Sequence, residues 1–391
     1  MNMKLRPLEL YLHLPFCVRK CNYCDFLSAA RSSEEKEQYL HALCAEIRRY
    51  GAELAPYGLT SVFLGGGTPS LLTPEELTKV MSTVYESFGV MRDAEITMEA
   101  NPGTLDPEKL SAMRQAGINR LSLGLQSTEN SELAALGRIH TYEDFLKTYA
   151  MARDAGFQNI NIDLMNALPG QSLESWKNTL ERVTALKPEH ISAYSLIIEK
   201  ETPFDRIYGE GRTEAERALA AGELGIEALP LPDEDTERAM YEAAGQILEA
   251  AGYHRYEISN YARKGFECRH NLGYWRRTEY IGCGLGASSL LMETRWDNEK
   301  DFQTYIAKVS QSGTGAGVKT KLSRNAQMEE YYFLGLRQTA GVEVKYAGVY
   351  APVINKLMKE GLLLRAPGNR VRLSERGIDI SNYVLADFIL Q

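Results

Sequence analysis

Residues 8–24 of the chain are LELYLHLPFCVRKCNYC, an apolar run that leads into a loop with three closely spaced cysteines. The run Leu8–Phe16 is typical of a strand. Cys17, Cys21 and Cys24 follow with the spacing C-x3-C-x2-C, so one short loop can direct three sulfurs at one centre. We therefore predict a first strand that ends in a metal-binding loop.

Three thiolates are one fewer than a closed tetrahedral zinc site or a fully protein-ligated iron–sulfur cluster requires. A [4Fe–4S] cluster held by three cysteines leaves one iron open to a small molecule that offers an amine and a carboxylate. The alternative is a zinc ion whose fourth ligand is a distant histidine, such as His13 or His41. Because C-x3-C is an unusual zinc knuckle, we favour the cluster.

Composition limits the class of protein. The chain has 391 residues, of which 44% are hydrophobic and 25% are charged, as in soluble globular proteins of two domains or one large barrel with an appendage. The net charge of −8 is unfavourable for non-specific nucleic-acid binding, and we expect no nucleic-acid partner.

Cysteine usage indicates the compartment. The remaining cysteines, Cys44, Cys268 and Cys283, are scattered, which is a metal-site pattern and not a disulfide framework. The first seven residues lack the apolar core of a signal peptide, and no segment has the length of apolar sequence that a membrane span needs. We expect a cytoplasmic protein.

Strand-like runs alternate with amphipathic helical segments in the first half of the chain. This alternation predicts an α/β fold with a parallel sheet, as a barrel or partial barrel in which ligands bind at the carboxyl ends of the strands. The predicted strands are Leu8–Phe16, Ser61–Leu64, Glu95–Glu99, Arg120–Gln126, Asn159–Met165 and His190–Ile198.

Glycines and polar residues gather where these strands end. The segments concerned are Gly65–Pro69, Glu99–Gly103, Gly124–Ser127 and Asp163. Because the carboxyl ends of parallel strands meet at one rim, we expect these residues to lie around a common ligand site.

The second half changes character. Residues 202–235 are predicted to be a loop with one helical piece, and Asp233–Ala251 a helix. Two later helices, at 326–337 and 353–360, precede a hairpin signal at 362–373, an order that resembles a winged-helix module. We favour a packing role for it over nucleic-acid binding. The predicted divisions are a core barrel at 1–240, a barrel-closing segment at 241–310 and a C-terminal domain at 311–391.

The cysteine spacing, Tyr23 before the last cysteine, and Gly65-Gly66-Gly67-Thr68-Pro69 together resemble the radical S-adenosylmethionine (SAM) superfamily. The resemblance implies a partial (β/α)6 TIM-like barrel and a [4Fe–4S] cluster on Cys17, Cys21 and Cys24. It also implies that SAM binds the open iron, and that the reduced cluster splits the sulfonium to a 5′-deoxyadenosyl radical.

Further segments narrow the resemblance to the oxygen-independent coproporphyrinogen III oxidase family. These segments are 11–17, 99–102, 123–127, 136–140 and 161–165. By position, the resemblance implies cofactor contacts from Tyr11, Tyr23, Gly66, Gly67, Thr68, Glu99, Gln126, Arg138 and Asp163. Arg138 suits the methionyl carboxylate and Glu99 the ammonium, whereas Gln126 and Asp163 suit ribose hydroxyls.

One departure from this family matters. The coproporphyrinogen oxidases that this chain resembles have the cysteine pattern C-x3-C-x2-C-x-C, but this chain has Phe26 in place of the last cysteine. The departure indicates the haem-chaperone branch of the family. His270-Asn271-Leu272-Gly273-Tyr274-Trp275 is similar to that branch's H-N-x-x-Y-W signature, which makes His270 a candidate haem ligand and Cys268 an alternative.

The resemblance therefore implies a protein that binds haem as cargo and delivers it to apo-haem acceptor proteins. An electron donor for the cluster, a homodimer and peripheral membrane contact are further expected partners or states. The alternative is a radical SAM enzyme that acts on a tetrapyrrole, by oxidative decarboxylation of coproporphyrinogen III or by reductive opening of the haem ring. Whether the protein is an enzyme is left open at this stage.

Overall fold

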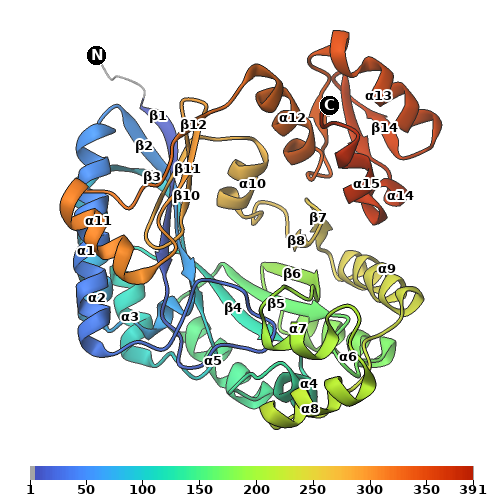
Figure 1. Cartoon of the computed structure of the whole chain (residues 1–391), viewed down its shortest axis with the longest axis horizontal. Coiled ribbons are helices and arrows are strands. Elements are labelled where there is room, and N and C mark those ends of the chain that lie inside the picture. Colours follow the sequence, from blue (N-terminus) through green and yellow to red (C-terminus); the bar gives the residue numbers. More distant parts are fainter. Residues whose placement is uncertain (1–4, 391) are drawn as a thin grey trace.

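Six parallel strands form the centre of the computed structural model, which describes residues 5–390 (Figure 1). Each pairs in parallel with the next along the chain, as the alternating sequence pattern predicts. They are β1 (Arg6–Leu14), β2 (Tyr57–Gly66), β3 (Gly89–Ala100), β4 (Arg120–Gln126), β5 (Ile160–Asn166) and β6 (His190–Ser195).

Helices connect these strands and cover the outer face of the sheet (Figure 1). Three of these connecting helices, α1, α2 and α5, begin with capping boxes. In each box the Ser or Thr side chain accepts from the backbone amide three positions on, and the acidic side chain there accepts from the amide of the Ser or Thr. The connecting elements are α1 (Ser33–Glu53), the 3-10 helix η1 (Pro69–Leu71), α2 (Pro74–Ser87), α3 (Pro107–Gln115), α4 (Asn130–Ala135), α5 (Tyr142–Asp154) and α6 (Leu173–Ala185).

Later segments extend the sheet at both edges to twelve strands, in the order β12-β11-β10-β9-β1-β2-β3-β4-β5-β6-β8-β7. At the β1 edge are β9 (Tyr280–Cys283), β10 (Ser288–Leu291), β11 (Thr294–Asp297) and β12 (Thr320–Lys321); at the β6 edge are β7 (His254–Arg255) and β8 (Asn260–Ala262). The result is an open, curved sheet, with α10 (Arg269–Trp275) inside the curve (Figure 1). This is the partial barrel expected from the sequence.

Alternating β1 side chains separate the two faces of the curve. Leu8, Leu10, Leu12 and Leu14 are fully buried in the core shared with the outer helices. Tyr11 and His13, on the other face of β1, contact groups inside the curve: Tyr11 packs on Phe63 of β2, and His13 bonds Tyr11. The inner side of β1 thus carries polar side chains, a property that suits a ligand site.

The segment at 202–235 contains two helices, α7 (Pro203–Tyr208) and α8 (Glu214–Leu224), where one helical piece was predicted. Each has a threonine N-cap, Thr202 and Thr213. The expected helix that follows is present as α9 (Glu234–Ala250). The prediction was incomplete because both helices are short and α8 is largely exposed, so neither has a strong apolar periodicity.

The C-terminal part has a core of its own, centred on Tyr332, Tyr350 and Phe388. Its order of helices followed by a hairpin agrees with the predicted winged-helix-like arrangement. The elements of this part are α12 (Arg324–Gly335), β13 (Val342–Glu343), α13 (Ala347–Lys359), β14 (Leu363–Ala366), β15 (Arg370–Leu373), α14 (Glu375–Asp379) and α15 (Ser381–Ala386). The helix before it, α11 (Phe302–Ser312), packs on α1 and belongs to the main core.

Strands on both sides of residues 240 and 310 belong to one continuous sheet. A separate barrel-closing unit at 241–310 therefore stays a prediction. Among residues 5–390, no helix combines the length and the apolar character that crossing a membrane demands.

Candidate cluster and cofactor site

The three cysteines line one cavity of about 370 Å³ at the carboxyl ends of the central strands. Backbone bonds fix their loop: Cys17 N donates to Ala29 O at 3.1 Å, and Asn22 N donates to Leu136 O at 3.0 Å. The predicted residues that line the same cavity are Cys17, Cys21, Tyr23, Cys24, Gly66, Gly67, Thr68, Glu99, Gln126, Arg138 and Asp163. Residues from five separate strand ends therefore converge as the sequence predicts.

The three thiols face one shared cavity. Within residues 5–390, no three cysteine, histidine or acidic side chains are gathered closely enough to hold a single ion. A cubane presents its irons at separate corners, so its ligand sulfurs need only face a shared space. Burial raises the pKa of Cys24 to about 11, and positive irons would offset that cost of forming the thiolate.

Neither proposed histidine completes a zinc site. Both ring nitrogens of His13 are engaged, Nδ1 with the Tyr11 hydroxyl at 3.1 Å and Nε2 with the Leu27 carbonyl at 2.9 Å. His41 lines a different cavity, between α1 and α11. The zinc alternative is therefore not supported.

The glycine-rich end of β2 lets backbone approach the cavity. Gly66 has φ of +110°, and a Cβ there would lie 2.6 Å from the His13 ring. A Cβ on Gly67 would lie 2.6 Å from the Phe16 carbonyl oxygen. Only glycine fits at both positions.

Glu99 provides a buried negative group on the cavity wall. Its Oε2 accepts from Gly66 N at 3.1 Å. Burial, together with the neighbouring Asp163 carboxylate, raises the pKa of Glu99 to about 8. A cationic ligand would offset both effects, so the position fits the ammonium or sulfonium of SAM.

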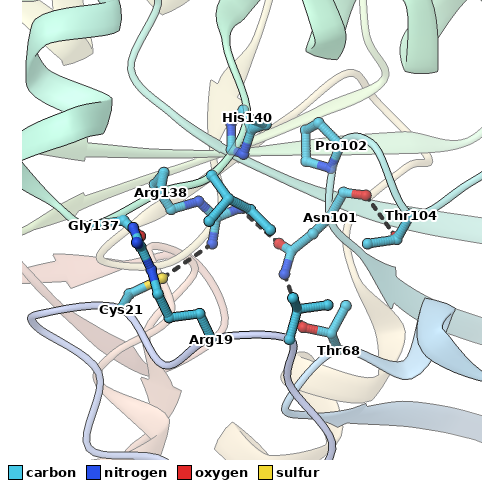
Figure 2. A pocket seen from close by; sticks show the side chains of 11 residues that line it. Arg19, Cys21, Thr68, Asn101, Pro102, Thr104, Gly137, Arg138 and His140 are labelled. Carbon is cyan, nitrogen blue, oxygen red and sulfur yellow. Dashed lines mark hydrogen bonds between the residues drawn. The ribbon is translucent and has the colours of Figure 1, made fainter. Parts of the chain in front are cut away.

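Arg138 lies beside Cys21 of the cysteine loop (Figure 2). Its Nη2 donates to Asn101 Oδ1 and to Gly124 O, each at 2.7 Å, and its Nη1 lies 3.6 Å from Cys21 Sγ. Arg138 Nε and Gln126 Oε1 are buried without a hydrogen-bond partner. A free donor on Arg138 fits a ligand carboxylate, and a free acceptor on Gln126 fits a ligand hydroxyl.

The backbone of Gln126 is in the left-handed region, with φ of 69°, at an irregularity in the β4–β5 register. Such strain in a non-glycine residue is common where a side chain must be aimed at a ligand. The prediction of Gln126 as a contact thus has independent geometric support.

The sequence pattern places Asn101 in the segment Glu99–Gly103 but predicts no role for it. In the structure its Nδ2 donates to Thr68 Oγ1 at 2.9 Å while its Oδ1 accepts from Arg138, so it links the segment after β2 to the loop after α4 (Figure 2). Tyr194 and Ser122 also line the cavity and were missed. Their positions inside the curve follow from strand alternation, but nothing in the sequence distinguishes them from ordinary strand residues.

Two predicted residues lie outside this cavity. Tyr11 lines a second cavity of about 440 Å³, together with Tyr274 and Trp275. His270 is 1% exposed, and its ring nitrogens face Ser61 Oγ at 2.8 Å and the Tyr274 hydroxyl at 2.9 Å. Burial lowers the pKa of His270 to about 3, so the ring is neutral and enclosed.

Cys268, the alternative haem ligand, is also buried. Its thiol donates to Glu95 Oε1 at 3.4 Å, and burial raises its pKa to about 12. Neither His270 nor Cys268 is therefore open to a haem iron in this conformation.

Comparison with known proteins agrees with this fold. The profile of the Radical SAM superfamily matches residues 11–183. The solved structure of coproporphyrinogen III oxidase (HemN) from Escherichia coli superposes with a TM-score of 0.82 at 24% identity, over 98% of this chain and 90% of that one. The fold and the three-cysteine cavity thus define a radical SAM protein, a class that carries a [4Fe–4S] cluster and SAM.

More similar sequences identify the branch. The heme chaperone HemW of Bacillus subtilis is 36% identical over 97% of this chain and 98% of its own length. HemW of Lactococcus lactis is 34% identical over 99% of each chain, and HemW of Escherichia coli is 39% identical over 73% of this chain and 70% of its own. The chain belongs to the HemW family.

Proposed function

We propose that this protein binds haem and delivers it to haem-requiring proteins. The supporting observation is the likeness to relatives named heme chaperones along almost the whole of both chains. The pattern of the coproporphyrinogen oxidases has a further cysteine at the position that Phe26 occupies here, and this difference supports the same choice. Phe26 is 59% exposed and lines the cluster cavity.

In this proposal Cys17, Cys21 and Cys24 hold the cluster. The cluster and SAM, when bound, supply one-electron reduction of a sulfonium. Glu99 accepts from the methionyl amino group, the Arg138 guanidinium pairs with the methionyl carboxylate, and Gly66 and Gly67 allow the backbone to approach. Gln126 and Asp163 accept ribose hydroxyls, while Thr68 and Tyr23 form the remaining wall.

We propose that haem contacts the protein through α10. Tyr274 and Trp275 form flat walls of the second cavity, and His270 precedes them on the same helix. Because Ser61 and Tyr274 now occupy the His270 ring, ligation of iron by His270 requires α10 to move. A neutral imidazole in this position needs no loss of a proton to become a ligand.

The test uses anaerobically reconstituted full-length protein. We expect about four irons per chain, near-stoichiometric haem binding and transfer of that haem to an apo-cytochrome. Replacing Cys17, Cys21 or Cys24 with Ser should remove most of the iron, whereas the buried and remote Cys44→Ser should retain it. Haem affinity no greater than that of an unrelated protein such as lysozyme would contradict the proposed function.

The second candidate is a radical enzyme that acts on a tetrapyrrole. The fold that this chain shares with coproporphyrinogen III oxidase is the observation in its favour. Mass spectrometry of anaerobic reactions with haem or coproporphyrinogen III distinguishes the two. A modified tetrapyrrole formed together with 5′-deoxyadenosine favours the enzyme, and unchanged haem favours the chaperone. The cytoplasmic location, electron donor, homodimer and peripheral membrane contact stay predictions from the sequence.

A further inference from the structure

A continuous series of buried hydrogen bonds links the cofactor cavity to the start of α10. Asp163 Oδ1 accepts from Asn161 Nδ2 at 2.9 Å, and Asn161 Oδ1 lies 2.6 Å from His190 Nδ1. His190 Nε2 lies 2.8 Å from the Tyr256 hydroxyl, which accepts from Cys268 N at 3.3 Å. Asn161, His190 and Tyr256 are at most 6% exposed, so water does not compete for these bonds.

The Asp163 carboxylate sets the direction of every bond in the series. A carboxylate only accepts, so the Asn161 amide must face it with Nδ2 and face His190 with Oδ1. His190 therefore carries its proton on Nδ1, and its Nε2 accepts from the Tyr256 hydroxyl. Burial holds the pKa of His190 well below its usual range, which agrees with this single neutral tautomer.

Helix α10 is held at the far end of the series. Its N-cap residue, Cys268, makes no side-chain capping bond. Glu95 of β3 supplies the cap instead, accepting from Arg269 N at 3.1 Å and from His270 N at 3.2 Å. Arg120, 2% exposed, provides a positive field that Glu95, Tyr256, Cys268 and Asp163 share.

The arrangement has a mechanical consequence. Ribose hydroxyls that donate to Asp163 add charge-assisted bonds and hold that carboxylate in one orientation. Asn161, His190 and Tyr256 are then held in turn, because each has one donor and one acceptor position within the series. The start of α10 becomes more rigid, and the haem contact needs α10 to move.

We propose that His190 and Tyr256 are positioning residues that couple the SAM site to helix α10, so that bound SAM lowers haem affinity. This inference rests on the proposed function for the identity of the second ligand. A coupling between two sites is reciprocal, so haem must lower SAM affinity by the same factor.

The experiment measures the dissociation constant of haem with and without saturating SAM, using reconstituted full-length protein. We expect SAM to weaken haem binding about fivefold or more in the unaltered protein. In Tyr256→Phe and in His190→Phe the ratio should approach one while both ligands still bind. Tyr253→Phe is the matched control, because this buried tyrosine donates to Pro188 O at 2.7 Å outside the series and should keep the ratio.

Amide hydrogen exchange of residues 269–275 gives a readout that does not depend on haem. SAM should slow exchange there in the unaltered protein and in Tyr253→Phe, but not in Tyr256→Phe or His190→Phe. A ratio of one in the unaltered protein, or full coupling in both network variants, would overturn the inference. Absence of haem binding would instead overturn the proposed function, and the exchange result would still decide whether the series transmits SAM binding.

Discussion

At the scale of single residues, the site has two kinds of group. Some side chains line the cavity, and others hydrogen-bond to those side chains and position them. Cys21 and Glu99 face the cavity and stand out in the sequence because of their spacing and position at strand ends. Asn101 and Asn161 act through other side chains, Arg138 and Asp163 respectively. A hydrogen bond between residues 37 positions apart leaves no local pattern, so only the structure identifies such partners.

Glu99→Gln tests the role of the buried carboxylate. Since the pKa of Glu99 is raised to about 8, its charged form increases as pH rises through that value, and the sulfonium of SAM, whose charge does not titrate, should be held more tightly at pH 9 than at pH 7. The amide cannot ionise, so the variant should bind about tenfold more weakly at pH 9 and lose the pH dependence. Equilibrium dialysis measures both, with the exposed Glu108→Gln of α3 as control. An unchanged pH dependence in Glu99→Gln would exclude this carboxylate as its source.

At the scale of elements, local pattern predicted the six central strands and the presence of helical segments between them. Arg120–Gln126 agrees with β4 at both ends, and β6 ends at Ser195, earlier than Ile198. The sequence did not predict that β9 lies beside β1, because pairing between residues 9 and 280 is decided by long-range packing. For the same reason it did not place α10 inside the curve of the sheet.

Helix α1 shows how one buried residue fixes distant loops. Glu46 accepts from Gly284 N at 2.8 Å, from Gly315 N at 2.7 Å and from the Tyr305 hydroxyl at 2.8 Å. Helix α11 and the loops after β9 and α11 therefore converge on α1. Losing this acceptor would leave several donors buried without partners, at about 1–3 kcal/mol each before relaxation.

We predict that Glu46 makes stability depend on pH. Burial raises its pKa from 4.5 to about 7 in the folded state, so the folded protein binds the proton more tightly than the unfolded chain. Its contribution is complete below pH 4.5 and decreases by about 3 kcal/mol as pH rises through 7. In urea unfolding at pH 5 and pH 8, Glu46→Gln should reduce the difference between the two free energies, and exposed Glu53→Gln on the same helix should not. Equal differences in both variants would contradict this assignment.

At the scale of the whole molecule, ionic contacts join the sheet to the C-terminal unit, which comprises α12 to α15 (residues 324–386). Glu330 of α12 accepts from Arg277 Nε at 2.9 Å and from Arg295 Nε at 2.7 Å, and Arg295 also lines the second cavity. Burial raises the pKa of Glu330, but the bonds from both arginines outweigh burial and lower it overall. The unit that closes over α10 is thus fixed by a mostly buried carboxylate shared between two cations.

This arrangement predicts that the C-terminal unit loosens before the sheet unfolds when Glu330 is replaced by Ala. The variant leaves Arg277 and Arg295 without their shared partner, and removing one member of a buried ion pair costs about 3–5 kcal/mol, less here because Arg295 is partly exposed. Because the folded pKa is lowered, the stabilisation is present above pH 4.5 and is lost as pH falls through the folded value. Acidification of the unaltered protein should therefore loosen the same unit.

Limited proteolysis near residues 320–324 and a second thermal transition would report this loosening. Glu343→Ala, at an exposed residue of the same unit, is the control. A single transition and unchanged cleavage in Glu330→Ala would show instead that the apolar core around Tyr332 holds the unit in place without the ion pairs.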